Sequence, residues 1–94
     1  MTNADNLVLL SSICDEIVST YEAKNSDYGD SFSHTIRKHG ILSSFIRIED
    51  KFRRFENLVL NGKGKVKDET IEDTLLDLAS YAIMTEMELR RKEE

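Results

Sequence analysis

The amino-acid sequence predicts an all-α fold, an antiparallel bundle of three to four helices that is completed by oligomerisation. Three observations carry this prediction. The 94 residues include no proline and only four glycines, so long helices meet few interruptions. Apolar residues recur at spacings of three and four in three separate stretches, as they do on one face of a helix. A chain of this length forms a single domain, residues 1–94, with a thin core that a partner subunit is expected to complete.

Composition excludes several classes of protein. A single cysteine rules out a disulfide framework and a cysteine-based zinc site. No apolar run approaches the roughly 18 residues that a membrane span requires, and the first residues lack the basic start and apolar stretch of a secretory signal. We therefore expect a cytoplasmic protein without a membrane partner. The formal net charge of −5 argues against a dedicated nucleic-acid binder, whose surface is normally basic.

The first predicted helix is amphipathic and ends before residue 24. Asn3 or Asp5 is its expected N-cap. The apolar residues of its stripe are Leu7, Leu10, Ile13, Cys14, Ile17, Val18 and Tyr21. Within that stripe, Cys14 is expected to be a small core residue. The next segment, KNSDYGDS over residues 24–31, is rich in turn-forming residues and is predicted to be a loop.

The second helical stretch runs from about Phe32 to Leu60, with a break or bend at Gly40. Beyond the glycine its apolar repeat is clear, and it consists of Ile41, Leu42, Phe45, Ile48, Phe52, Phe55 and Val59. A basic connection over residues 61–69 follows, and it separates this stretch from the third helix.

The third helix is predicted to begin after this connection and to continue into the charged C-terminal residues. Asp68, followed by Thr70, offers an N-cap, and Glu69 lies favourably at the positive end of the helix dipole. One face of the helix carries Ile71, Leu75, Leu78, Ala82 and Thr85. Other apolar residues lie on its remaining sides, which is why we expect a partner subunit.

Carboxylates on the third helix form the first candidate site. At roughly 100° per residue, Glu69, Asp73 and Asp77 fall on one narrow stripe, away from the side expected to face solvent. Carboxylates among apolar neighbours need a cationic partner. That partner is either a set of arginines from the second helical stretch or a divalent metal such as Mg²⁺, which prefers oxygen ligands. The sequence leaves both alternatives open.

The second helical stretch adds another carboxylate. Leu42, Phe45, Glu49 and Phe52 recur at helical spacing on one predicted face, and Glu49 is the only member that is not apolar. We therefore expect Glu49 to point inward. An inward Glu49 that faces Asp73 and Asp77 predicts a divalent-metal site between two helices. Asp50 and Arg54 lie one turn apart and are expected to pair on the surface.

Three segments together resemble a known family. They are KNSDYGDS (24–31), SSFIRIEDKFRRFENL (43–58) and DETIEDTLLDLASYAIM (68–84). Over residues 20–88 the chain resembles the MazG-like superfamily of all-α nucleoside triphosphate pyrophosphatases, in its phage-enriched, nucleotide-modification-associated branch. The resemblance implies a homo-oligomer, dimer or tetramer, in a bacterial or phage-infected cell. It also implies that Mg²⁺, or Mn²⁺ in its place, supports hydrolysis of a nucleoside triphosphate to monophosphate and pyrophosphate.

The resemblance also implies roles for particular residues. Glu49 and Asp50 match the position of the first acidic motif and would be catalytic, with Glu49 also a metal ligand. The remaining metal ligands implied by position are Glu69, Asp73 and Asp77. Phosphate oxygens would be held by Lys24, Lys51 or Arg54, the base would stack on Tyr28, and its edge would be read by Asn25 or Asp27.

One departure from the family pattern affects the predicted function. The first acidic motif usually has two glutamates three residues apart, whereas Arg53 stands where another acid is expected, so the metal site is one ligand short. An alternative function is therefore a non-catalytic protein that binds a nucleotide or cyclic nucleotide and sequesters this signal, against a host defence. A third reading is a helical oligomerisation module in which every charge belongs to a surface pair.

Overall fold

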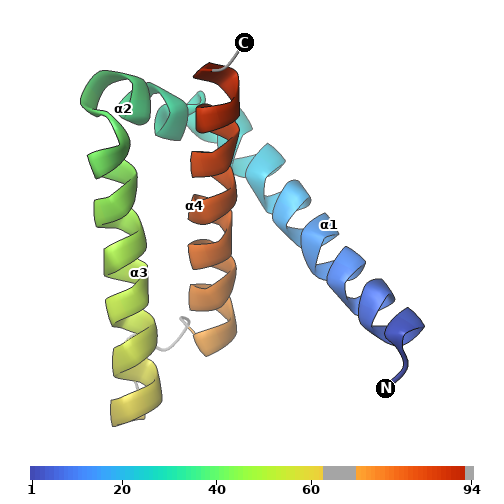
Figure 1. Cartoon of the computed structure of the whole chain (residues 1–94). Coiled ribbons are helices and arrows are strands. Elements are labelled where there is room, and N and C mark those ends of the chain that lie inside the picture. Colours follow the sequence, from blue (N-terminus) through green and yellow to red (C-terminus); the bar gives the residue numbers. More distant parts are fainter. Residues whose placement is uncertain (63–69, 93–94) are drawn as a thin grey trace. The chain divides into compact units, whose positions relative to one another are not determined.

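The computed structural model describes residues 1–62 and 70–92 of the chain. The described helices are α1 (Asn3–Tyr28), α2 (Ser31–His39), α3 (Ile41–Asn61) and α4 (Ile71–Lys92) (Figure 1). No strand is found among the described residues, so the predicted all-α class is confirmed. The chain divides into two compact units, Met1–Ser31 and Phe32–Glu94. The expectation of a single domain stays a prediction. Within the described ranges, no helix is both long enough and apolar enough to span a bilayer.

A capping box formed by two side chains begins α1. The Thr2 hydroxyl accepts a hydrogen bond from the Asp5 backbone N–H at 3.1 Å, and the Asp5 carboxylate accepts one from the Thr2 backbone N–H at 3.0 Å. Hydrogen bonds from the Thr2 backbone first, and then from its hydroxyl, lower the pKa of Asp5. The N-cap is therefore Thr2. The prediction of Asn3 or Asp5 is wrong, although Asp5 takes part in the cap.

The C-terminal end of α1 lies at Tyr28, so the predicted loop over residues 24–31 is wrong except at Gly29 and Asp30. Gly29 ends the helix with a left-handed backbone (φ 61°), and its N–H donates to the Asn25 carbonyl at 3.0 Å. Once a helix has formed, each added residue gains one hydrogen bond, so turn-forming residues prolong it until a glycine ends it. Only Gly29 and Asp30 connect α1 to α2.

The side chains of α1 are not covered within its own unit, since no residue of this helix is buried. Leu7 and Leu10 are each 57% exposed and Val18 is 63% exposed. Cys14 is exposed as well, so its predicted core role is wrong. An apolar stripe predicts that a helix is amphipathic, but it does not supply the neighbour that buries the stripe.

The break predicted at Gly40 is confirmed. Gly40 has a φ of 80°, a backbone conformation that a side chain would strain, and its N–H donates to the Ile36 carbonyl at 2.7 Å. At the start of α3, the Gly40 carbonyl accepts hydrogen bonds from the backbone N–H of Ser43 at 3.2 Å and from its hydroxyl at 2.8 Å. The glycine thus ends one helix and begins the next.

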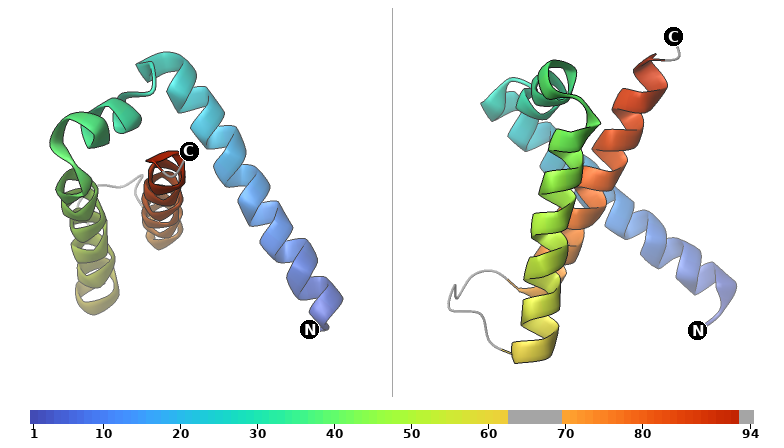
Figure 2. Two further views of the ribbon diagram at one scale, coloured as in Figure 1. Left: turned by 45° about the horizontal axis from the view of Figure 1, so that its top comes forward. Right: turned by 60° about the vertical axis from the view of Figure 1, so that its left-hand side comes forward.

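The helices α3 and α4 lie side by side and run in opposite directions (Figures 1 and 2). Contacts at successive turns fix their register, and they join Lys51 to Asp77, Arg47 to Tyr81 and Ser44 to Thr85. Thr74, on the same side of α4, is fully buried. We call this set the polar seam: Ser44, Arg47, Lys51, Thr74, Asp77, Tyr81 and Thr85. The predicted antiparallel arrangement is present, but polar side chains form much of the contact.

The apolar line of α3 is not the face that contacts α4. Leu42, Phe45 and Phe52 are 63%, 59% and 52% exposed, and the Glu49 side chain is 43% exposed. The prediction that this line points inward is therefore wrong. Its physical reason is that the hydrogen bonds, ion pair and ring contacts of the polar seam hold α3 against α4 through another side of the helix, the side that also carries the buried Leu58.

The helix α2 packs where α3 begins and α4 ends (Figure 2). Phe32 and Ile36 of α2 are 8% and 5% exposed, so this short helix supplies most of the buried apolar side chains of its unit. The Phe32 ring stacks on the Tyr81 ring of α4, with the ring centroids 5.7 Å apart and an angle of 21° between the planes. This stacking joins α2 to the polar seam.

A buried carboxylate also joins α2 to α4. Glu88 is 6% exposed, its Oε1 accepts a hydrogen bond from Arg91 Nη1 at 2.6 Å, and its Oε2 lies 3.7 Å from Arg37 Nε. The Ser33 hydroxyl is the largest cause of a lowered pKa of Glu88, burial opposes it, and Arg91 and Arg37 lower it further. Glu88 is therefore a charged link between the two helices.

Candidate functional site

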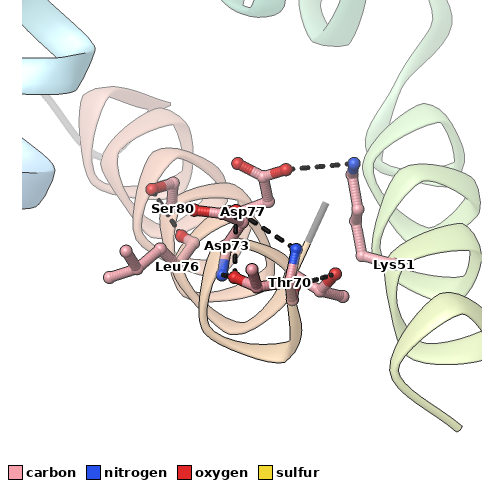
Figure 3. Close-up of polar contacts among 7 residues, drawn as sticks. Lys51, Thr70, Asp73, Leu76, Asp77 and Ser80 are labelled. Atoms are coloured by element: carbon pink, nitrogen blue, oxygen red, sulfur yellow. Dashed lines mark hydrogen bonds and ion pairs between the residues drawn. The ribbon is translucent and has the colours of Figure 1, made fainter. Parts of the chain in front are cut away.

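The centre of the candidate site is an ion pair across the polar seam. Lys51 Nζ of α3 lies 3.0 Å from Asp77 Oδ2 of α4, and the two side chains are 25% and 34% exposed (Figure 3). Asp77 was expected to need a cation, and in the structure a lysine of the neighbouring helix provides one. An acid and a base thus lie together in a half-buried position.

Asp73, one turn before Asp77, belongs to the N-terminal cap of α4. Its backbone N–H donates to the Thr70 hydroxyl at 3.0 Å, and its carboxylate accepts hydrogen bonds from the Thr70 backbone N–H at 3.2 Å and hydroxyl at 2.9 Å (Figure 3). This is a capping box, the same arrangement that begins α1. Asp73 is exposed, so its carboxylate is held in place and open to solvent. Asp68 and Glu69, the other residues expected at this end, lie outside the described residues.

The acidic residues of α3 do not face Asp77. Glu49 pairs with Arg53 at 3.9 Å, one turn along the same helix, and Asp50 is exposed. Glu49 lies two positions before Lys51, which is about 200° around the helix axis. Because Lys51 points at Asp77, Glu49 lies on the far side of α3. The structure therefore does not bring Glu49 to Asp73 and Asp77, and its catalytic and metal-binding roles stay predictions.

The described part of the chain contains no group of three or more His, Cys, Asp or Glu side chains suited to hold a metal ion. Asp73 and Asp77 nevertheless lie one turn apart on α4. Magnesium is usually bound by one or two protein carboxylates together with substrate phosphates, so this pair meets the minimum for such an ion.

The residues predicted to recognise a nucleotide fall in both units of the chain. Lys24, Asn25, Asp27 and Tyr28 occupy the last turns of α1, where a loop was expected. Tyr28 is 71% exposed, and the Asn25 carbonyl accepts the hydrogen bond that ends the helix. Lys51 and Arg54 belong to α3, in the second unit, and both are half-buried.

Sequence reasoning missed Arg47. Its guanidinium carbon lies 5.6 Å from the Phe32 ring centroid and 6.0 Å from the Tyr81 ring centroid, where α2, α3 and α4 meet. A polar stripe at helical spacing runs along α3 through Ser44, Arg47, Lys51 and Arg54. The spacing of these four residues is visible in the sequence, but a polar helix face is ordinarily expected to face solvent.

Comparison with known proteins identifies the family. The family described as nucleotide modification associated domain 1 matches residues 24–89, which is more than half of the chain. This match runs from the last turns of α1 through α2 and α3 into the last turns of α4, and so contains the whole polar seam. No curated protein and no solved structure matches the chain. The chain belongs to the nucleotide modification associated domain 1 family.

Proposed function

We propose that this protein is a magnesium-dependent nucleoside triphosphate pyrophosphohydrolase of MazG-like architecture, which releases a monophosphate and pyrophosphate. The observation that carries the proposal is the pairing of Asp77 with Lys51 in the polar seam, one turn from Asp73. A nucleotide triphosphate needs carboxylates for its metal ion and cations for its phosphates, and this position offers both. The family, named for association with nucleotide modification, supports a nucleotide as the substrate.

Magnesium would be held by Asp73 and Asp77, with Glu69 as a further ligand. When bound, this ion neutralises phosphate charge and orients an attacking water, and manganese accepts the same oxygen ligands. In the proposal, Lys51 and Arg54 hold phosphate oxygens, as charge-assisted hydrogen bonds from ammonium and guanidinium groups do. Glu49 and Asp50 stay proposed catalytic residues as the first acidic motif, although within one copy of the chain Glu49 faces away from Asp77 and pairs with Arg53.

The base of the nucleotide would be recognised by residues of α1. Tyr28 offers an exposed aromatic ring for stacking, and Lys24, Asn25 and Asp27 supply polar groups on the same turns. The same turns lie at the start of the matched family region, which begins at Lys24. We therefore keep Asn25, Asp27 and Tyr28 as proposed contacts of the base and Lys24 as a proposed phosphate contact, all within the first unit.

Product analysis tests the proposal. Each of the common ribo- and deoxyribonucleoside triphosphates would be incubated with the purified protein and Mg²⁺, and in parallel with EDTA. We expect equal amounts of monophosphate and pyrophosphate from at least one substrate with Mg²⁺, and none with EDTA. Release of inorganic phosphate and diphosphate instead would contradict a pyrophosphohydrolase.

A second candidate function is metal-independent binding of a nucleotide or cyclic nucleotide without cleavage. The observation that favours it is again the Lys51–Asp77 pair, because the ammonium at 3.0 Å already balances the carboxylate that a metal would require. This candidate predicts that titrations in EDTA retain full affinity and that the ligand is recovered intact. A phage protein with these properties would sequester a signalling nucleotide of its host.

A second copy of the chain is the proposed partner for the apolar face of α3. Its exposed residues are Ile41 (55%), Leu42 (63%), Phe45 (59%), Ile46 (49%), Phe52 (52%) and Val59 (53%). Exposed patches of this kind on one helix mark an interaction surface. Within the described residues of the second unit these side chains stay exposed, so we propose a homo-oligomer, dimer or tetramer.

Replacing Phe52 by glutamate is expected to dissociate this oligomer. Burial of one phenylalanine contributes about 2 kcal/mol for each copy, and an introduced carboxylate adds a desolvation cost. Light scattering coupled to size-exclusion chromatography would report a lower mass for Phe52→Glu, while the conservative Phe52→Leu keeps the wild-type mass. A wild-type protein that is monomeric at millimolar concentration would contradict the proposal.

A further inference from the structure

The guanidinium of Arg47 is held by two aromatic rings in the polar seam. It lies 5.6 Å from the Phe32 centroid and 6.0 Å from the Tyr81 centroid, and these rings are themselves 5.7 Å apart. The three groups therefore form a nearly equilateral cluster where α2, α3 and α4 meet. Contacts of this kind fix the position of a guanidinium through the ring faces and leave its N–H donors unused.

Those donors have no acceptor among the residues that the structure describes. Among the described residues, Arg47 makes the two ring contacts but no ion pair and no hydrogen bond. Its neighbours on α3 differ, since Lys51 pairs with Asp77 and Arg53 pairs with Glu49. Arg47 is only partly exposed. A charged group removed in part from water without a counter-charge is unfavourable unless a ligand supplies the counter-charge.

We infer that Arg47 is a phosphate-binding residue and that its N–H donors receive two oxygens of the phosphate chain of a nucleoside di- or triphosphate. The planar guanidinium matches a phosphate group in a bidentate arrangement. Lys51 lies four residues further along α3, about 6 Å along the axis, and would contact the next phosphate of the chain. This inference rests on the proposed function, and it assigns the recognition of phosphate to a residue outside the acidic motifs.

Local charge supports an anionic ligand at this position. The chain as a whole carries a formal net charge of −5. The α3 side of the polar seam nevertheless presents Arg47 and Lys51 on one face, opposite the single carboxylate of Asp77. Glu88, the buried carboxylate nearest the end of α4, is already bound to Arg91 and Arg37. The polar seam itself therefore carries two positive charges and one negative charge, although the chain as a whole is acidic.

Isothermal titration with inorganic tripolyphosphate and with nucleoside triphosphates tests the inference on the full chain, in EDTA. We expect Arg47→Met to weaken the binding of both by about tenfold or more, the loss expected when a charged hydrogen-bond donor is removed. Arg47→Lys keeps a cation over the rings but lacks the planar guanidinium that binds two phosphate oxygens, so we expect an intermediate loss of affinity. Arg53→Met is the matched control on the same helix, with a side chain that is 73% exposed, and should bind as wild type does.

Each outcome distinguishes the inference from the proposed function. Wild-type affinity in Arg47→Met, with intact hydrolysis, would overturn the role of Arg47 and leave the proposed function in place. A wild-type protein that binds neither tripolyphosphate nor any nucleotide, in EDTA or with Mg²⁺, would overturn both. If Arg47→Met does not fold, the affinity of Arg47→Lys for tripolyphosphate tests the inference instead. A purely structural role of Arg47 predicts that this affinity is unchanged, whereas phosphate binding by Arg47 predicts that it falls.

Discussion

Replacing Asp77 by asparagine is expected to lower the rate of nucleoside triphosphate hydrolysis by about a hundredfold or more. Losses of that size are typical when one charged or hydrogen-bonding group that stabilises a transition state is removed. The substitution keeps the size of the side chain but removes the charge that would hold Mg²⁺ and that pairs with Lys51 at 3.0 Å. Initial rates of pyrophosphate release at saturating Mg²⁺ measure the effect.

A matched variant on the same helix controls for loss of charge alone. Glu86 is an exposed acid of α4 that pairs with Arg90 at 3.2 Å, away from the polar seam, and Glu86→Gln should hydrolyse at the wild-type rate. The Lys51–Asp77 pair is partly exposed, so Asp77→Asn should cost no more than about 1 kcal/mol of folding free energy. An Asp77→Asn protein with wild-type turnover would contradict the proposed metal site.

Replacing Glu88 by glutamine is expected to destabilise the second unit by about 2 kcal/mol, which corresponds to a fall in melting temperature of roughly 10 °C. The buried carboxylate accepts a hydrogen bond from Arg91 at 2.6 Å and faces Arg37 of α2 at 3.7 Å. The two arginine side chains are 41% and 59% exposed, so they regain water in the variant and the cost stays moderate. Thermal unfolding followed by circular dichroism, with Glu86→Gln as the control, measures the difference.

The stabilisation by Glu88 should also depend on pH. Because its pKa is lowered from the ordinary value of 4.5, by the Ser33 hydroxyl first and then by Arg91 and Arg37, the folded state favours the charged form. The stabilisation is therefore fully present above about pH 4.5 and is lost as the pH falls through the lowered pKa of the folded state. The gap in melting temperature between wild type and Glu88→Gln should narrow over that range. A gap that is constant down to pH 3 would contradict the charged link.

Much of the fold could be predicted from the sequence because helices follow local rules. The spacing of apolar residues and the glycine at position 40 predict α3 and its first residue. The end of α1 was misplaced because the turn-forming residues 24–28 do not by themselves stop a helix, whereas Gly29 does. The Thr-x-x-Asp pattern, present at Thr2 and again at Thr70, would have located the first residues of both helices.

The candidate site was only partly predictable because it depends on which helix faces meet. Asp77 was singled out correctly as a carboxylate that needs a cation, and Lys51 supplies it. The inward direction assigned to Glu49 was wrong, since an apolar line indicates an amphipathic helix without naming the face that another helix covers. Arg47 was missed because its contacts come from α2 and α4, and the polar stripe of α3 does not by itself show that other helices cover it.

Exchanging the two charges of the ion pair tests most directly whether the polar seam is a nucleotide site or only a structural contact. In the double variant Lys51→Asp with Asp77→Lys, an acid and a base still face each other across α3 and α4, so the melting temperature should stay within a few degrees of wild type. Nucleotide binding and pyrophosphate release, measured on the same sample, should both fall at least about a hundredfold, because the metal-binding and phosphate-binding groups have changed places. A double variant that folds and still binds and hydrolyses nucleotide at the wild-type level would contradict a nucleotide site in the polar seam.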